Sequence, residues 1–266
     1  MSRRDRTLTA PPWPVAIPAT LAVLFLGLPL AGLLLRAPWG DMWSVLTSPT
    51  SLQALRLSLE TATAATVAAL VLGLPLAWLL ARAEFPGRRL ARALVTVPLV
   101  LPPVVGGIAL LLAFGRRGFV GQYLDSCCGV GLPFTTPGVV VAETFVAMPF
   151  LVITVEGALR GLDTRFEDAA ATLGAARLTV FRRVTLPLVL PSLAAGTVLT
   201  FARALGEFGA TITFAGNFPG RTQTLPIAVY LALESNPSAA IAVSLVMMAV
   251  SGAVLVALRG HWLGSR

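Results

Sequence analysis

The sequence predicts an all-α polytopic membrane protein with six transmembrane helices. Hydrophobic residues make up 56% of the 266 residues and charged residues only 12%, whereas charged residues are about a quarter of a soluble domain. The apolar residues gather in six runs of about 20 residues, the length that spans a hydrocarbon core as a helix. The 20 basic residues, all arginines, lie mostly between these runs. Their expected partner is therefore the lipid membrane and not nucleic acid.

The first three expected spans cover residues 15–35, 61–81 and 93–115. The first run is longer than the apolar core of a signal peptide, so we interpret it as a membrane span. The third run contains several prolines and glycines, and prolines free backbone carbonyls that neighbours or water must satisfy. A helix broken at residues 101–107 is therefore expected, either as a pore-lining element or as a kink packed against other helices.

The last three expected spans cover residues 137–157, 188–207 and 239–258. Glu143 lies inside the fourth span, and an intramembrane carboxylate is a functional candidate by default. It is only about six residues from the start of that span, roughly 9 Å, so the alternative is a side chain that reaches interfacial water. No soluble domain or long linker is indicated. Residues 1–266 are therefore expected to form one transmembrane domain.

The arginines are distributed unequally between the two sides of this arrangement. Fourteen of the 20 lie in the two termini and in the loops that follow the second and fourth spans. The side richer in arginine faces the cytoplasm in multi-pass membrane proteins. We therefore expect a multi-pass protein with both termini in the cytoplasm.

The residue types present argue against several kinds of chemistry. There is no lysine, so the chain has no Walker A loop, whose lysine holds nucleotide phosphates. The single histidine, His261, provides neither a histidine metal site nor a histidine-based triad. Cys127 and Cys128 are adjacent, a poor geometry for an ordinary disulfide, and we interpret them as incidental loop residues. We expect no catalytic residue, no metal site and no cofactor.

Residues 160–187, called the signature loop from here on, are the most charged part of the chain. Thr164 and Glu167 have the spacing of a capping box, which predicts that a helix begins here. The alanines after Asp168 favour a helix whose nearly bare surface a partner can approach closely. Gly174 removes the last Cβ where a turn is needed. Pro187 is expected to open the next helix, because its missing N–H costs nothing at that position.

The signature loop resembles that of the ABC-importer permeases. Its Asp-Ala-Ala is followed by three residues, a glycine, nine residues and Val-Thr-Leu-Pro; the family has Glu and Ile where this chain has Asp168 and Val184. The resemblance implies a type I permease fold whose cytoplasmic loop forms a coupling helix that docks on a separate ABC ATPase subunit. The implied ATPase-coupling residues are Glu167, Asp168, Ala169, Ala170, Gly174, Val184, Leu186 and Pro187. Glu167 lies one residue early, so which acid meets the ATPase stays open.

The segment from Arg203 to Asn217 is similar to that of the molybdate permease branch of this family. The resemblance implies import of molybdate, and of tungstate by the same route, across the inner membrane of a prokaryote. It also implies an external substrate-binding protein and a second permease copy as partners. The segment is rich in threonine and glycine, which can donate hydrogen bonds to an oxyanion. The candidate substrate-pathway residues are Arg203, Glu207, Thr211, Thr213 and Asn217.

Two alternatives remain at this stage. Within the same family, the chain could be a sulfate or thiosulfate permease. In another class, it could be an ion-coupled secondary transporter that uses Glu143 and the Arg203/Glu207 pair for proton coupling. The signature loop argues against the second alternative, because an ion-coupled carrier has no use for an ATPase dock.

Overall fold

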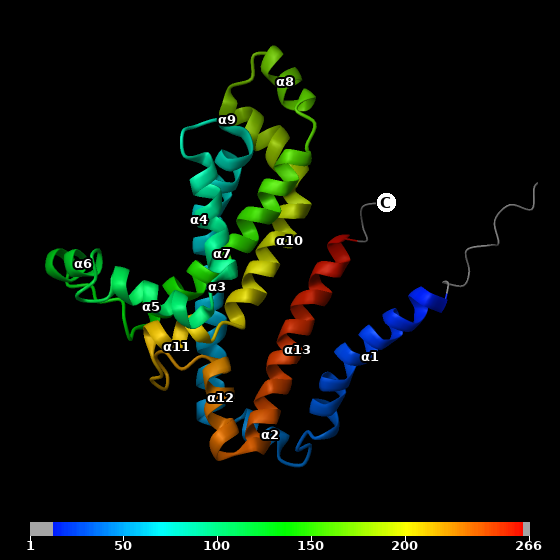
Figure 1. Cartoon of the computed structure of the whole chain (residues 1–266), viewed down its shortest axis with the longest axis vertical. Coiled ribbons are helices and arrows are strands. Elements are labelled where there is room, and N and C mark those ends of the chain that lie inside the picture. Colours follow the sequence, from blue (N-terminus) through cyan, green and yellow to red (C-terminus); the bar gives the residue numbers. More distant parts are fainter. Residues whose placement is uncertain (1–12, 263–266) are drawn as a thin grey trace, which may run out of the picture.

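The computed structural model describes residues 13–262, and these residues form thirteen α-helices and one π-helix without a β-strand (Figure 1). The expected all-α fold class is confirmed. Four helical segments are long and apolar enough to cross a membrane, namely α1 (Trp13–Leu35), α3 (Pro49–Arg82), α7 (Thr136–Gly161) and the continuous stretch Arg177–Leu205. Shorter apolar helices include α5 (Pro103–Phe114), α12 (Leu225–Ser235) and part of α13 (Pro237–Trp262). The count of six spans stays a prediction.

The centre of the fold is the packing of α3 and α10 (Leu186–Leu205) against α7. Small residues on α3 allow this close approach, since Ala62, Ala65 and Ala69 are fully buried there. At Gly73, an added Cβ would lie 3.2 Å from Cγ2 of Val152 on α7. Small residues let helix backbones approach closely where lipid, instead of water, surrounds the protein.

The third expected span is not one continuous helix, and its extent of 93–115 as a membrane span stays a prediction. It consists of α4 (Arg88–Val100) and α5, separated by Leu101 and Pro102 in extended backbone. A residue that precedes proline is pushed out of the helical region, and here two prolines follow each other. The expected break is thus confirmed at its first two residues. Gly106 and Gly107 instead lie inside α5, where Gly107 packs closely against α11 (Gly209–Ala215).

Two other helices begin earlier than expected. α3 starts at Pro49, where the Ser48 hydroxyl accepts a hydrogen bond from the Ser51 amide at 3.3 Å. The helix expected to open at Pro187 runs back through the π-helix η1 (Phe181–Thr185) to α9 (Arg177–Val180). Pro187 cannot donate a backbone hydrogen bond to the preceding turn. The π-helix ends at Thr185, two residues before Pro187, and the helix continues into α10.

The elements are spread along the long axis of the molecule. In Figure 1, α8 (Arg165–Thr172) and α9 lie at one end, and α2 (Met42–Leu46) and α12 lie at the other. α6 (Gly121–Cys128) projects sideways from the body. α1 lies to one side and contacts α13, and none of its residues is buried. Arg3, Arg4, Arg6 and Arg266, on which the expected orientation partly depends, lie outside the described residues.

Candidate functional site

The signature loop folds into α8, a tight turn, and the helical stretch from α9 through η1 into α10. A helix does begin near Thr164, as expected, but the capping box is wrong. The Thr164 side chain makes no cap hydrogen bond. Instead, Oδ1 of Asp163 accepts a hydrogen bond from the Arg165 amide at 3.0 Å. The Glu167 side chain does not cap the helix because it is engaged elsewhere.

Glu167 points back into its own chain. Its Oε1 accepts a hydrogen bond from Oγ1 of Thr185 at 2.7 Å and forms an ion pair with Arg82 at 3.3 Å. The Glu167 and Arg82 side chains are only 19% and 16% exposed. These contacts tie α8 to the last residue of α3 and to the end of η1. Sequence reasoning missed Arg82 and Thr185, although Thr185 lies within the signature motif itself.

Asp168, the next residue of α8, has an exposed side chain. The two acids are therefore not equivalent, because one is held by the chain itself and the other faces outward. The outward-facing acid is the one that occupies the motif position. Of the two, Asp168 is free to meet a partner.

Gly174 ends α8 in the left-handed conformation, with a φ of +82°. The Ala175 amide donates to the Ala170 carbonyl at 3.1 Å and the Gly174 amide donates to the Ala171 carbonyl at 2.9 Å. This pair of bonds is the Schellman arrangement, which strongly favours glycine. A Cβ added at Gly174 would meet nothing within 4 Å in the single chain. Within the single chain the turn accounts for the glycine, and the space beside it is open to a partner.

Large apolar side chains are exposed on the same loop. Phe166, Leu173 and Leu178 all project outward, and Leu173 is 88% exposed. Exposed apolar side chains grouped in this way mark a contact with another protein or with the membrane. Ala169 is also exposed and Ala170 is half-buried. The remaining motif residues lie on the stretch from η1 to α10 and are Val184, Leu186 and Pro187. Val184 and Leu186 are half-buried there.

The expected pair of Arg203 and Glu207 forms an ion pair of 2.6 Å at the end of α10. Glu207 is 1% exposed, and its Oε1 also accepts a hydrogen bond from the Ala210 amide at 2.8 Å. Arg203 is 28% exposed. The pair thus joins α10 to α11 across a short break in the helix. Its role in oxyanion passage stays a prediction.

The other three candidate pathway residues have different surroundings. Thr211 is fully buried on α11, and its hydroxyl has no hydrogen-bond partner among the described residues. Thr213 donates to the Gly209 carbonyl at 2.8 Å. Asn217 is exposed in the loop after α11.

Glu143 does not reach interfacial water within the described chain, so the alternative expected for it is wrong. Its side chain is 1% exposed, and its Oε1 accepts a hydrogen bond from Oγ1 of Thr61 at 3.0 Å. The reason is that α3 packs against α7, so that Thr61 on α3 lies against the Glu143 side chain.

A pocket of about 730 Å³ lies among the loops around α6 and after α11. Arg116 and Arg221 both line it, together with Asp125 and Thr135. Neither arginine forms an ion pair with another described residue. Sequence reasoning counted these arginines only as loop charges, because nothing in their spacing shows that the 104 intervening residues fold back on themselves. Within the described residues, no group of histidine, cysteine and carboxylate side chains could hold a metal ion.

Comparisons with known proteins agree on one family. The family model described as "Binding-protein-dependent transport system inner membrane component" matches residues 69–262. The chain is 49% identical over 246 residues to the molybdenum transport system permease protein ModB of Mycobacterium bovis, covering 92% of each chain. It is 39% identical over 232 residues to the sulfate transport system permease protein CysT of Salmonella typhimurium, covering 86% of this chain and 83% of that one.

The fold is also that of a solved transporter. The crystal structure of a bacterial ABC transporter involved in the import of the acidic polysaccharide alginate contains a chain that superposes with a TM-score of 0.72. The two chains are 19% identical, and the match covers 96% of this chain and 94% of the other. At this identity the likeness bears on the fold alone.

Proposed function

The chain belongs to the family of binding-protein-dependent transport system inner membrane components, and from this premise we propose that it is the permease subunit of an ATP-driven molybdate importer. The observation that supports molybdate as the substrate is the 49% identity to a molybdenum transport permease over 92% of both chains. Tungstate has the same charge and tetrahedral shape as molybdate, and it follows the same route. The subunit itself is not an enzyme, because ATP is hydrolysed by a separate partner.

The signature loop is the ATPase dock in this proposal. Its end of the molecule faces the cytoplasm, and α8 presents Asp168, Phe166 and Leu173 to a groove on the ATPase subunit. ATP binding in the ATPase pair moves α8. The contacts of Glu167 with Arg82 and Thr185 carry that motion to α3 and α10, and the spans then alternate between outward and inward access.

The oxyanion pathway needs further subunits. Two copies of the permease enclose the path, and an external binding protein delivers the oxyanion at the end opposite the signature loop. Two arginine-containing features lie away from the signature loop. They are the Arg203/Glu207 pair, with Thr211, Thr213 and Asn217 after it, and the pocket lined by Arg116 and Arg221. Arginine suits oxyanions because its guanidinium donates several hydrogen bonds from one plane.

The test is ATP hydrolysis by the reconstituted complex of permease, ATPase and binding protein. Molybdate and tungstate should stimulate hydrolysis much more than sulfate does. Hydrolysis without added oxyanion gives the baseline, and complex without binding protein gives the control.

A sulfate permease is the second candidate, and the 39% identity to a sulfate transport permease favours it specifically. Equal or greater stimulation by sulfate would assign the chain to that branch. No stimulation by any of the three oxyanions, with an intact complex, would contradict both candidates.

A further inference from the structure

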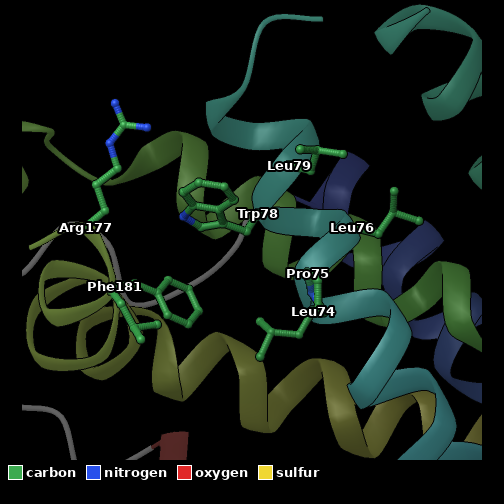
Figure 2. A pocket seen from close by; sticks show the side chains of 8 residues that line it. Leu74, Pro75, Leu76, Trp78, Leu79, Arg177 and Phe181 are labelled. Carbon is green, nitrogen blue, oxygen red and sulfur yellow. The ribbon is translucent and has the colours of Figure 1, made fainter.

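An apolar groove of about 590 Å³ lies between the C-terminal half of α3 and the α9–η1 segment. Leu74, Leu76 and Trp78 line one side of it, and Leu178 and Phe181 line the other. Figure 2 shows the rings of Trp78 and Phe181 and the Leu74 side chain around the opening. The two rings meet edge to face, with their centroids 6.3 Å apart. The groove is thus a shaped hollow and not a gap between loosely placed helices.

The groove carries one charge. Arg177 is its only charged lining residue, and it forms no ion pair with another described residue. In Figure 2 its guanidinium points away from the apolar centre. A neighbouring polar hollow shares Trp78, Arg177 and Phe181 with the groove and also contains Asp168 and Glu167. Glu167 is already paired with Arg82, so Asp168 is the one acid in that hollow without an ion pair among the described residues.

The helix ends and residue types at the groove are those expected where the chain leaves the bilayer. Trp78 is one helical turn before Arg82, the last residue of α3, and Arg177 is the first residue of α9. Tryptophan is enriched at the boundary between acyl chains and headgroups, and arginine near helix ends extends its charge toward that boundary. Leu74 lies another turn deeper in α3. The groove therefore runs from the headgroup level into the acyl-chain level.

We propose that this groove binds an anionic phospholipid of the cytoplasmic leaflet, with an acyl chain along Leu74, Trp78 and Phe181 and the phosphate on Arg177. The proposal rests on the orientation given under the proposed function. Water fits the groove poorly because the lining offers almost no hydrogen-bond partners. Basic pockets between helices on the cytoplasmic side suit anionic headgroups. A second permease copy and the ATPase subunit are the rival occupants.

A lipid at this position contacts two segments that we expect to move relative to each other. α3 forms one wall, and the other wall is the segment that connects α8 to α10. In the proposed transport cycle these two walls move relative to each other when the ATPase moves α8. The bound lipid is thus placed to stabilise the packing of α3 against the α9–η1 segment.

The experiment uses the permease–ATPase complex in nanodiscs of phosphatidylcholine with or without phosphatidylglycerol. Phosphatidylglycerol with a photoreactive group on its acyl chain should label peptides that contain Trp78 or Phe181. Arg177→Gln should reduce this labelling about five-fold relative to the unchanged complex, the factor that corresponds to one basic residue at an anionic surface. Leu74→Trp, which fills the groove, should also reduce this labelling.

Arg183→Gln is the matched control, because it removes the same charge from an exposed arginine of η1 outside the groove lining. Labelling that is unchanged in Arg177→Gln, or that falls equally in Arg183→Gln, would overturn the proposal. So would a photoreactive residue at Leu178 that crosslinks to the second copy or the ATPase and not to lipid. Lipid labelling needs no molybdate, so its result is independent of the substrate test.

Discussion

At the scale of single residues, Glu167 and Asp168 show how neighbouring acids take different roles. The sequence placed both in the ATPase-coupling set, and their order in the motif left open which one meets the partner. The contacts distinguish the two acids, because Glu167 is held by Arg82 and Thr185 while Asp168 is exposed. We infer that Glu167 positions α8 and that Asp168 contacts the ATPase.

Glu167→Gln should therefore lower the molybdate taken up per ATP hydrolysed, while ATPase binding stays near normal. Loss of the charge leaves Arg82 partly buried without its partner, which costs about 1–3 kcal/mol. Asp168→Asn should instead reduce co-purification of the ATPase subunit. The two variants would be compared in the same reconstituted complex, by uptake, hydrolysis and pull-down.

A double variant checks the Glu167 mechanism. If the ion pair is the cause, Arg82→Gln combined with Glu167→Gln should be no worse than either change alone. Additive losses would contradict the pairing as the origin of the effect.

Gly174 has two separable requirements, its left-handed backbone and the space beside it. Gly174→Leu should abolish uptake, because a non-glycine residue in this conformation costs about 1–2 kcal/mol and overpacking at the interface costs about 1–3 kcal/mol more. Gly174→Asn separates the causes, since asparagine tolerates this conformation but still adds a side chain. We expect Asn to impair ATPase co-purification nearly as much as Leu. Near-normal binding with Asn would assign the glycine to the turn alone.

At the scale of elements, the sequence predicted helices where an apolar run was long, and it predicted helix ends and breaks at glycine and proline. The apolar runs are helical, the proline pair breaks the third run, and Gly174 ends α8. The short helix α11 was not predicted, because Gly206 to Asn217 reads as a glycine-rich loop. The π turn before Pro187 and the pairing of Arg82 with Glu167 depend on which segments meet in space. Contacts between segments that are distant in the sequence leave no local sequence pattern.

The contact between α5 and α11 depends on Gly107. An added Cβ there would lie 2.6 Å from Cβ of Thr213 and 2.9 Å from the Ala210 carbonyl oxygen. Gly107→Ala must therefore shift α11 and should destabilise the permease by about 1–3 kcal/mol, with lower uptake because α11 is joined to the Arg203/Glu207 pair. The measurement is thermal unfolding of the detergent-solubilised complex alongside uptake.

Gly157→Ala is the matched control for this contact. Gly157 lies inside α7, and an added Cβ there would meet nothing within 4 Å. It should leave uptake unchanged and hold or slightly raise stability, since alanine favours a helix by about 1 kcal/mol over glycine. Equal losses in both variants would remove the α5–α11 contact as the explanation.

At the scale of the whole molecule, a single chain is incomplete as a transporter. α1 contacts α13 but buries none of its own residues, and α5 exposes Val104, Ile108 and Leu112. Lipid can cover such surfaces, and so can a second copy of the chain. The distribution of arginines predicts the orientation of the chain across the membrane. It does not show which surfaces contact lipid and which contact another subunit. Orientation is therefore the property of the whole molecule that a labelling experiment can test first.

Cysteine labelling in intact cells should find the signature loop on the cytoplasmic side. The background is Cys127→Ser with Cys128→Ser, because both native cysteines are exposed. Leu173→Cys is a better label position than Ala175→Cys, since Leu173 is 88% exposed and Ala175 is half-buried. A membrane-impermeant maleimide should leave Leu173→Cys unmodified until the cells are opened. The same reagent should modify Asn217→Cys, whose side chain is exposed near the opposite end of α10, in intact cells. Modification of Leu173→Cys in intact cells would show that the signature loop lies outside the cell. The predicted orientation would then be wrong, because an ATPase in the cytoplasm could not reach α8.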